Sequence, residues 1–368
     1  MTSAHIPFLD VRPQEDATAV NDAIKRVIDS GQFILGPEVQ AFEQEFAEAS
    51  ALTHAVGVGN GTDALCLLLE GLGIGAGDEV ITTALSAGFT AIAIIRSGAT
   101  PVFVDIDEHR LTLDPAAVRS AITPRTAAII PVHLYGQAAD LTTLSQLATR
   151  HNLALIEDCC QAHLATYQGR AVGSFGHGCA FSFYPTKNLG ALGDGGAACT
   201  NDAGLAERIR SLRNGGMSRT SYHEHAGINS RLDELQAAVL RARLPFLSGW
   251  TTKRRMLVAR YRERLHGHAI ALPSEIDPGH VYHLFPIRAT RREQLREHLG
   301  NSGIDTVVHY PTPLPEQPAF KSNTAVMCPV AEDICQEIVS LPLHPQLTAD
   351  AVDRIIETVN DFDRTSHR

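Results

Sequence analysis

The architecture of this chain follows from one run, Cys179-Ala-Phe-Ser-Phe-Tyr-Pro-Thr-Lys-Asn-Leu-Gly-Ala-Leu-Gly-Asp-Gly-Gly196. It begins as an apolar strand, breaks at Pro185, presents Lys187 and continues in glycine-rich backbone. A lysine in a loop is usually a solvated surface charge, but Lys187 is the only lysine between positions 25 and 253. We therefore predict that its amine is held at a strand end and desolvated enough to act as a nucleophile.

Strand-like apolar runs recur on both sides of this segment and alternate with helix-like stretches. They cover residues 53–59, 79–82, 101–105, 127–133, 153–157, 179–184 and 196–200. Such alternation predicts βαβ units and therefore an α/β fold, in which a mainly parallel sheet has helices on both faces. Ligands of such sheets bind beyond the carboxyl ends of the strands, so the residues that follow each strand are candidates for function.

The pattern changes near Pro245, where a basic helix-like run begins, followed by a proline-rich region over 310–318 and a last helix-like stretch. We predict an N-terminal segment and large domain over 1–245 and a smaller α+β C-terminal domain over 246–368. Val39, Phe42 and Phe46 recur at helical spacing after Gly36-Pro37, which predicts a helix packed on the rest of the chain.

Composition excludes several classes of protein. The 368 residues carry a net charge of -10, so no basic field attracts a nucleic acid. The first residues lack the basic end and apolar stretch of a signal peptide, and no apolar run approaches membrane-spanning length. We expect a cytoplasmic protein without nucleic-acid or membrane partners. The seven cysteines are scattered without metal-ligand spacing, which predicts reduced, structural thiols.

A glycine-rich turn, Gly57-Val-Gly-Asn-Gly-Thr-Asp63, leads from a strand into a helix-like stretch. Free amides at a helix N-terminus, together with the Thr62 hydroxyl, form a cup for a phosphate dianion. The alternative is a plain strand-to-helix turn capped by Asn60 or Thr62, and the turn taken alone favours that alternative.

An acid follows directly on the buried strand of Ala154-Leu-Ile-Glu-Asp158. A carboxylate there can pair with the pyridine nitrogen of pyridoxal 5'-phosphate (PLP) and keep that nitrogen protonated. The alternative is a helix cap or a surface acid. Gln161 and His163 on the next turn could reach the ring hydroxyl or a substrate. Lysine, acid and phosphate cup at three strand ends together predict a PLP site with Lys187 as the Schiff-base lysine.

Four motifs in a fixed order resemble the DegT/DnrJ/EryC1/StrS sugar aminotransferases, a branch of the fold-type I PLP enzymes. The motifs are Gly59-Asn-Gly-Thr-Asp-Ala-Leu65, Glu157-Asp-Cys-Cys-Gln-Ala-His163, Phe181-Ser-Phe-Tyr-Pro-Thr-Lys-Asn-Leu-Gly190 and Gly227-Ile-Asn-Ser-Arg-Leu-Asp-Glu-Leu-Gln-Ala-Ala238. The similarity runs from about Ile6 to near Phe320. It implies the fold-type I aminotransferase architecture, with a mixed seven-stranded sheet in the large domain.

The resemblance also implies roles for individual residues. Lys187 would carry the cofactor and shuttle the proton between cofactor and substrate carbons. Asp158 would hold the pyridine nitrogen and Gln161 the ring hydroxyl. Asn229 would reach the phosphate of the neighbouring subunit, which makes a homodimer obligatory for activity. The residues implied at the phosphate of the same subunit are Gly61, Thr62 and Ser182.

Several positions leave alternatives open. Ser230 and Asp233 could form a capping box for the next helix, so that Asn229 only shapes the start of that helix. Ala87 stands where many relatives have an aromatic residue that stacks on the cofactor ring; Phe89 is a candidate substitute or a core residue. Pro315 stands where relatives often have a histidine. The candidate substrate contacts are His163, Tyr184, His309 and Tyr310.

His223-Glu-His225 lies in a polar stretch between 218 and 227 without a further ligand, and we interpret it as a solvated loop rather than a metal site. No metal is expected elsewhere.

The expected reaction moves the amino group of L-glutamate to a keto group of a dTDP-linked keto-deoxysugar. The resemblance of the 229–238 segment indicates that this keto group is at C-3. Alternatives are a C-4 aminotransferase of the same family and another fold-type I enzyme, an amino-acid aminotransferase or a lyase. The latter would need an arginine for the α-carboxylate, and Arg288 or several other C-terminal arginines could serve. A dehydratase of the family would lack Lys187. A PLP-binding regulatory protein is disfavoured by the complete set of lysine, acid and phosphate cup.

Overall fold

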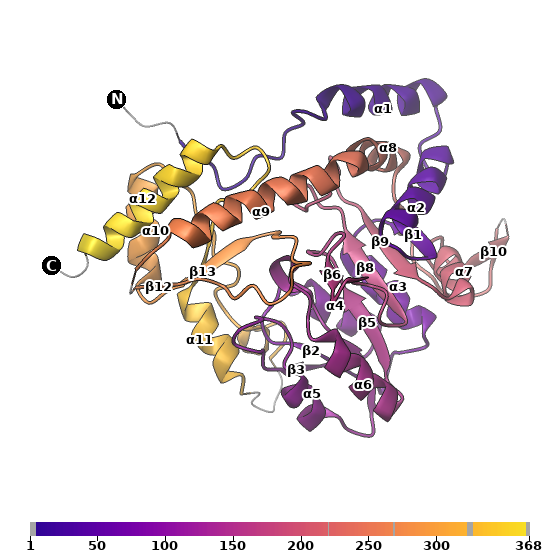
Figure 1. Ribbon diagram of the computed structural model, residues 1–368. Coiled ribbons are helices and arrows are strands. Elements are labelled where there is room, and N and C mark those ends of the chain that lie inside the picture. Colours follow the sequence, from indigo (N-terminus) through magenta and orange to yellow (C-terminus); the bar gives the residue numbers. More distant parts are fainter. Residues whose placement is uncertain (1–4, 220, 268, 322–326, 366–368) are drawn as a thin grey trace.

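The computed structural model describes residues 5–219, 221–267, 269–321 and 327–365. A seven-stranded sheet runs through its centre (Figure 1). In spatial order its strands are β1 (His54–Val58), β9 (Gly196–Thr200), β8 (Gly178–Ser182), β5 (Ala154–Asp158), β4 (Thr126–Ile130), β2 (Glu79–Thr83) and β3 (Thr100–Val104). Neighbouring strands are parallel except where β9 pairs with β1 and β8. The prediction of a mainly parallel, mixed sheet of seven strands is confirmed.

Helices cover both faces of this sheet because its strands are apolar on both sides. In β8, Cys179 and Phe181 belong to one hydrophobic core and Ala180 belongs to the opposite core. One face packs against α3 (Gly61–Gly71), α4 (Phe89–Arg96) and α7 (Ala203–Leu212). The other packs against α2 (Pro37–Ala49), α5 (Pro115–Ala121), α6 (Leu141–His151) and α8 (Glu234–Arg243).

The helix predicted after Gly36-Pro37 is α2, and its first residue is Pro37. Val39, Phe42 and Phe46 are buried on the sheet, where both phenylalanine rings meet the edge of the Phe183 ring. A separate helix, α1 (Ala17–Ser30), lies along α8 at the outside of the molecule (Figure 1).

The C-terminal part of the chain builds a second, three-stranded antiparallel sheet from β12 (Ile270–Ala271), β13 (Phe285–Ala289) and β14 (Ile338–Leu341). Its hydrophobic core includes residues of α9 (Leu247–Arg264), α10 (Arg292–Asn301) and α12 (Ala349–Thr365), and Ile6 from the N-terminal segment. α11 (Pro329–Glu337) joins a further core beside the large sheet. The domain boundary at 245/246 falls just before α9 and stays a prediction.

Short elements complete the chain. They are the hairpins β6 (Thr166–Tyr167) with β7 (Arg170–Ala171) and β10 (Met217–Arg219) with β11 (Tyr222–His223), and the single turns η1 (Leu134–Gly136), η2 (Leu244–Phe246) and η3 (Leu314–Glu316). The stretch over 218–227 was predicted as a loop, but it includes the β10–β11 hairpin. Local pairing of two short strands leaves almost no pattern in the sequence.

No helix within the described ranges is long and apolar enough to span a membrane. All seven cysteines are free thiols; six are buried, and Cys160 is partly exposed.

Candidate active site

Lys187 lies in the tight turn that follows β8. Its amide donates a hydrogen bond to the Tyr184 carbonyl oxygen, at 2.8 Å. The side chain is partly buried, and this burial lowers the pKa of the amine. Electrostatic interactions with Cys160 and Asp158 oppose that effect and raise the pKa, so the amine lies within electrostatic reach of both groups. A lysine with a lowered pKa more readily supplies the neutral amine that attacks a carbonyl carbon.

Asp158 is the last residue of β5 and is only 5% exposed. Its Oδ2 accepts a hydrogen bond from the Thr90 hydroxyl at 2.7 Å, and its Oδ1 accepts one from the Cys160 amide at 3.0 Å. The two bonds fix the orientation of the carboxylate. Thr90 belongs to the first turn of α4 and was not among the residues predicted from the sequence. The available signal was its place in the helix that follows β2.

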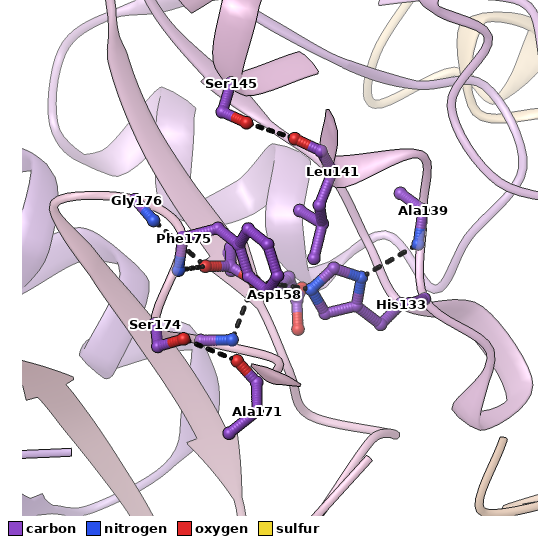
Figure 2. Close-up of polar contacts among 12 residues, drawn as sticks. His133, Ala139, Leu141, Ser145, Asp158, Ala171, Ser174, Phe175 and Gly176 are labelled. Atoms are coloured by element: carbon purple, nitrogen blue, oxygen red, sulfur yellow. Dashed lines mark hydrogen bonds and ion pairs between the residues drawn. The ribbon is translucent and has the colours of Figure 1, made fainter. Parts of the chain in front are cut away.

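Glu157, one residue earlier, points to the opposite face of the sheet and is fully buried. His133 Nε2 donates a hydrogen bond to it at 3.0 Å, while His133 Nδ1 accepts one from the Ala139 amide at 3.1 Å. Figure 2 shows His133 and the backbone of the 175–176 loop converging beside Asp158. The other donors to the carboxylate are the amides of Gly173 (2.7 Å), Phe175 (2.8 Å) and Gly176 (3.1 Å).

This network also explains a cluster that resembles a metal site. Ligand atoms of His133, Glu157 and Cys159 lie within 4.8 Å of one another. Because the carboxylate and both ring nitrogens already make hydrogen bonds, these groups have a structural function: they fasten the end of β5.

The glycine-rich turn forms the N-terminus of α3. Asn60 is the N-cap, and its side chain accepts a hydrogen bond from the Asp63 amide at 2.8 Å. The cap leaves the amides of Gly61 and Thr62, which have no acceptor inside the helix, at the open end. A Cβ on Gly61 would lie 2.7 Å from Cys160 Sγ and 3.0 Å from Ser182 Cβ. The structure therefore brings Gly61 and Ser182 together.

β9 packs closely against the turn that forms this cup. A Cβ on Gly196 would come within 2.4 Å of the Asn60 carbonyl carbon and 2.8 Å of the Gly61 amide nitrogen. Only glycine allows the first residue of β9 to pass so close under the turn. At both positions a side chain would collide with atoms already present, so the close packing around the turn requires glycine.

Gln161 connects the turn after β5 to the C-terminal part of the chain. Its Oε1 accepts a hydrogen bond from the Tyr135 amide at 2.7 Å, and its Nε2 donates one to the Tyr310 hydroxyl at 3.2 Å. His309 Nδ1 is 3.0 Å from Ser340 Oγ. Burial and, secondarily, the Lys187 charge lower the pKa of His309 to about 4, so its ring is neutral at pH 7. His309 and Tyr310 therefore lie near Lys187 and Gln161, and their contact with a substrate stays a prediction.

Among the candidate substrate contacts, His163 is the one that is fully enclosed. It is fully buried between the rings of Phe181 and Phe183, and its Nε2 donates a hydrogen bond to the Ser182 carbonyl oxygen at 2.8 Å. Burial and the nearby Lys187 charge lower its pKa to about 3. A solute could not reach this ring without displacing its neighbours, so we now expect His163 to hold Ser182 rather than to contact a substrate.

Three predicted contacts lie on the open surface. Phe89 is 63% exposed and Tyr184 is 52% exposed, and Asn229 is exposed as well. The capping box of Ser230 and Asp233 is wrong: α8 has Asp233 as N-cap without a side-chain hydrogen bond. The Ser230 hydroxyl instead accepts from the Gly59 amide at 2.9 Å and donates to Asp63 Oδ2 at 2.7 Å. Ser230 thus ties the 227–238 segment to the phosphate-cup turn.

Known proteins match the chain over almost its whole length. The model of the DegT/DnrJ/EryC1/StrS aminotransferase family matches residues 14–360. A "dTDP-3-amino-3,4,6-trideoxy-alpha-D-glucose transaminase" of Streptomyces venezuelae is 48% identical, over 97% of this chain and 96% of the relative. The crystal structure of S. venezuelae DesV superposes with a TM-score of 0.95 at 47% identity, covering 98% of this chain and 99% of the other.

A second solved structure bears on the cofactor. NtdA from Bacillus subtilis, crystallised with bound cofactor PMP, superposes with a TM-score of 0.92 at 30% identity, covering 99% of this chain and 87% of the other. The fold and the site together define an enzyme of the aminotransferase class. The chain belongs to the DegT/DnrJ/EryC1/StrS aminotransferase family, as its four motifs predicted.

Proposed function

We propose that this enzyme binds PLP through Lys187 and transfers the amino group of L-glutamate to the C-3 keto group of a dTDP-linked keto-deoxysugar. The observation that carries the proposal is that Lys187, in the turn after β8, lies within electrostatic reach of the buried, oriented Asp158 carboxylate at the end of the neighbouring parallel strand β5. A cytoplasmic location is part of the proposal.

The residues present fit the cofactor. The N-terminus of α3 presents the amides of Gly61 and Thr62 beside Ser182, and such amides suit a phosphate dianion. Asp158 would hold the pyridine nitrogen protonated, and Gln161 would contact the ring hydroxyl. When bound, PLP withdraws electrons from the substrate carbon. Lys187 would then move the proton between the two carbons that exchange the amine.

The proposed sugar and the proposed position of amination rest on sequence similarity to relatives. The S. venezuelae relative is named for a 3-amino product on a dTDP sugar, and it shares nearly half of its residues with this chain. The 229–238 segment resembles C-3 enzymes as well. We therefore propose C-3 rather than C-4 as the carbon that receives the amine.

One experiment tests both levels of the proposal. The absorbance spectrum of the PLP-loaded protein is recorded before and after addition of L-glutamate, and we expect the lysine-bound form to convert to the pyridoxamine form. The converted protein is then mixed with dTDP-3-keto and dTDP-4-keto deoxysugars, and NMR locates the amine in the product. A spectrum unchanged by glutamate would overturn the donor, and an amine at C-4 would overturn the position.

The substitution Gly61→Ala tests the phosphate cup. The added methyl would collide with Cys160 Sγ and Ser182 Cβ, so we expect the dissociation constant for PLP to rise at least about tenfold, the loss of roughly one charge-assisted hydrogen bond. Gly249→Ala in α9 is the matched control, because a Cβ there meets open space and alanine favours the helix. Unchanged PLP affinity in the Gly61→Ala variant would contradict the placement of the phosphate.

We further propose that Asn229 completes the site of a second copy in a homodimer. Phe89, Tyr184 and Asn229 are exposed in the single chain, where a second copy could cover them. Mixing two inactive variants, Lys187→Ala and Asn229→Ala, should then restore activity. One site of each hybrid dimer would combine an intact lysine with an intact asparagine.

The readout is turnover after the two variants are unfolded and refolded together, compared with each variant refolded alone. Restoration to about a quarter of wild-type activity is expected from random pairing, in which half of the dimers carry one intact site. If Asn229 served the site of its own subunit, no hybrid would contain an intact site and the mixture would stay inactive.

A further inference from the structure

Arg254 in α9 is a buried cation without a counter-ion among the described residues. Its side chain belongs to a residue only 3% exposed, and its Nε and Nη1 have no hydrogen-bond partner among the described residues. The described part of the chain also places no carboxylate within ion-pair distance of it. Burial lowers the pKa of the guanidinium to about 10, and no carboxylate counteracts this effect. Arg254 is therefore charged at neutral pH.

Neighbouring arginines differ in this respect. Arg243 pairs with Asp16 at 2.7 Å, and Arg12 pairs with Asp10 at 2.6 Å. All three arginines line the same small cavity, but within the described ranges only Arg254 lacks a carboxylate partner. Burying an unpaired charge is strongly unfavourable, so a group from outside the chain is the natural counter-ion.

The cavity itself indicates the size of that group. Its volume is about 50 Å³, and its walls include Lys187, Asn188, Trp250, Arg254 and His344. A single water needs roughly 10–15 Å³ in such a space, so the cavity has room for a small group such as a carboxylate. A guanidinium presents parallel N–H groups that match the two oxygens of a carboxylate.

We propose that Arg254 binds the α-carboxylate of the amino donor, an inference that rests on the proposed transamination. In an amino acid the α-carboxylate is bonded to the carbon that loses its proton, so it must lie close to Lys187, which lines the same cavity. The diphosphate of a nucleotide sugar is separated from C-3 by part of the sugar ring. Because Arg254 and Lys187 line one cavity, the arginine suits the α-carboxylate of the donor better than the diphosphate.

The two half-reactions of the PLP-loaded enzyme separate these possibilities. For Arg254→Gln we expect the L-glutamate concentration at half-maximal rate to rise at least about thirtyfold, as for a lost charged contact. The L-glutamine concentration at half-maximal rate should rise equally, because L-glutamine keeps the α-carboxylate. Reaction of the pyridoxamine form with the keto sugar should change less than about twofold. Arg254→Lys keeps the charge without the planar fork. Its L-glutamate concentration at half-maximal rate should lie between the values for Arg254→Gln and the wild type.

Arg255→Gln is the matched control, because the next residue of α9 is exposed and its Nε donates to the His280 carbonyl oxygen at 3.0 Å. It should leave both half-reactions unchanged. Equal losses in both half-reactions of Arg254→Gln would mean a structural role and overturn the inference. A loss confined to the sugar would assign the arginine to the nucleotide, and a loss with glutamate but not glutamine would assign it to the γ-carboxylate. Each of these last two results would also overturn the proposal that Arg254 binds the α-carboxylate.

A readout without turnover keeps this test separate from the proposed function. Glutarate, a dicarboxylate that has no amine to react, should raise the thermal unfolding midpoint of the PLP-loaded wild type and of Arg255→Gln, but not that of Arg254→Gln. If the wild type fails to react with glutamate but shows this difference, the donor is wrong and the carboxylate site stands. An identical glutarate shift in all three proteins would overturn the site.

Discussion

Replacing Lys187 with alanine is expected to lower turnover by at least about 10³-fold, because the variant lacks both the covalent anchor of the cofactor and the acid/base that moves the proton. The side chain is only partly buried in the turn after β8, so its loss should leave the protein folded. PLP should still bind weakly in the phosphate cup. Turnover measures the loss of activity, and the absorbance of the lysine-bound cofactor and mass spectrometry after borohydride reduction measure the loss of the covalent anchor.

Lys253→Ala provides the matched control. That lysine lies in α9, is 47% exposed and pairs with Glu15 at 2.9 Å on the surface. Its loss should change neither turnover nor the spectrum, and borohydride should still attach the cofactor at Lys187. A normal spectrum of lysine-bound cofactor in Lys187→Ala would remove the lysine from its role.

Asp158→Asn is expected to lower turnover by about 10²–10³-fold while PLP remains bound. Asparagine has nearly the same size and can still accept the hydrogen bond from Thr90. It carries no negative charge, however, and therefore cannot keep the pyridine nitrogen protonated. Because the electron-withdrawing power of the ring serves both half-reactions, the rates with glutamate and with the keto sugar should fall together.

Asp105 offers a comparison for this second variant. It also follows a parallel strand, β3, and its carboxylate accepts hydrogen bonds from the Val330 and Ala331 amides, both at 2.9 Å. Asp105→Asn should lower the unfolding temperature and leave the rate of either half-reaction unchanged. If Asp158→Asn behaved in the same way, its carboxylate would be a structural acid.

Much of the fold could be predicted because each strand of the large sheet is a short apolar run between helical segments. The direction of β9 is the part that the apolar pattern does not encode, since its Gly196–Thr200 run reads like any other strand. The physical reason lies in the connection from Ser182 to Gly196, which contains no helix. A parallel return usually needs a helical crossover.

The site was predictable to the extent that its residues follow strands in the sequence. Lys187, Asp158 and Gln161 do so. Thr90 was missed because its bond to Asp158 joins positions 68 residues apart. Arg254 was read as part of a basic, helix-like run, and only tertiary packing distinguishes it from the exposed Arg255.

His163 shows the opposite error. A histidine on the turn after a catalytic-type acid can point to either face of the sheet, and the sequence does not say which. The two rings of Phe181 and Phe183 supply an apolar pocket on the core side, and the Ser182 carbonyl oxygen accepts a hydrogen bond from Nε2 there, while Nδ1 has no partner among the described residues.

The hydrogen bonds around Glu157 have a consequence for how the enzyme acquires its cofactor. Every donor to that carboxylate belongs to this chain, so the end of β5 is fastened whether or not a ligand is present. Asp158 is the next residue of β5, so its backbone is held in place by the same hydrogen bonds. We therefore expect the proposed cofactor to find the Asp158 carboxylate already oriented, so that its binding requires little ordering of the backbone there.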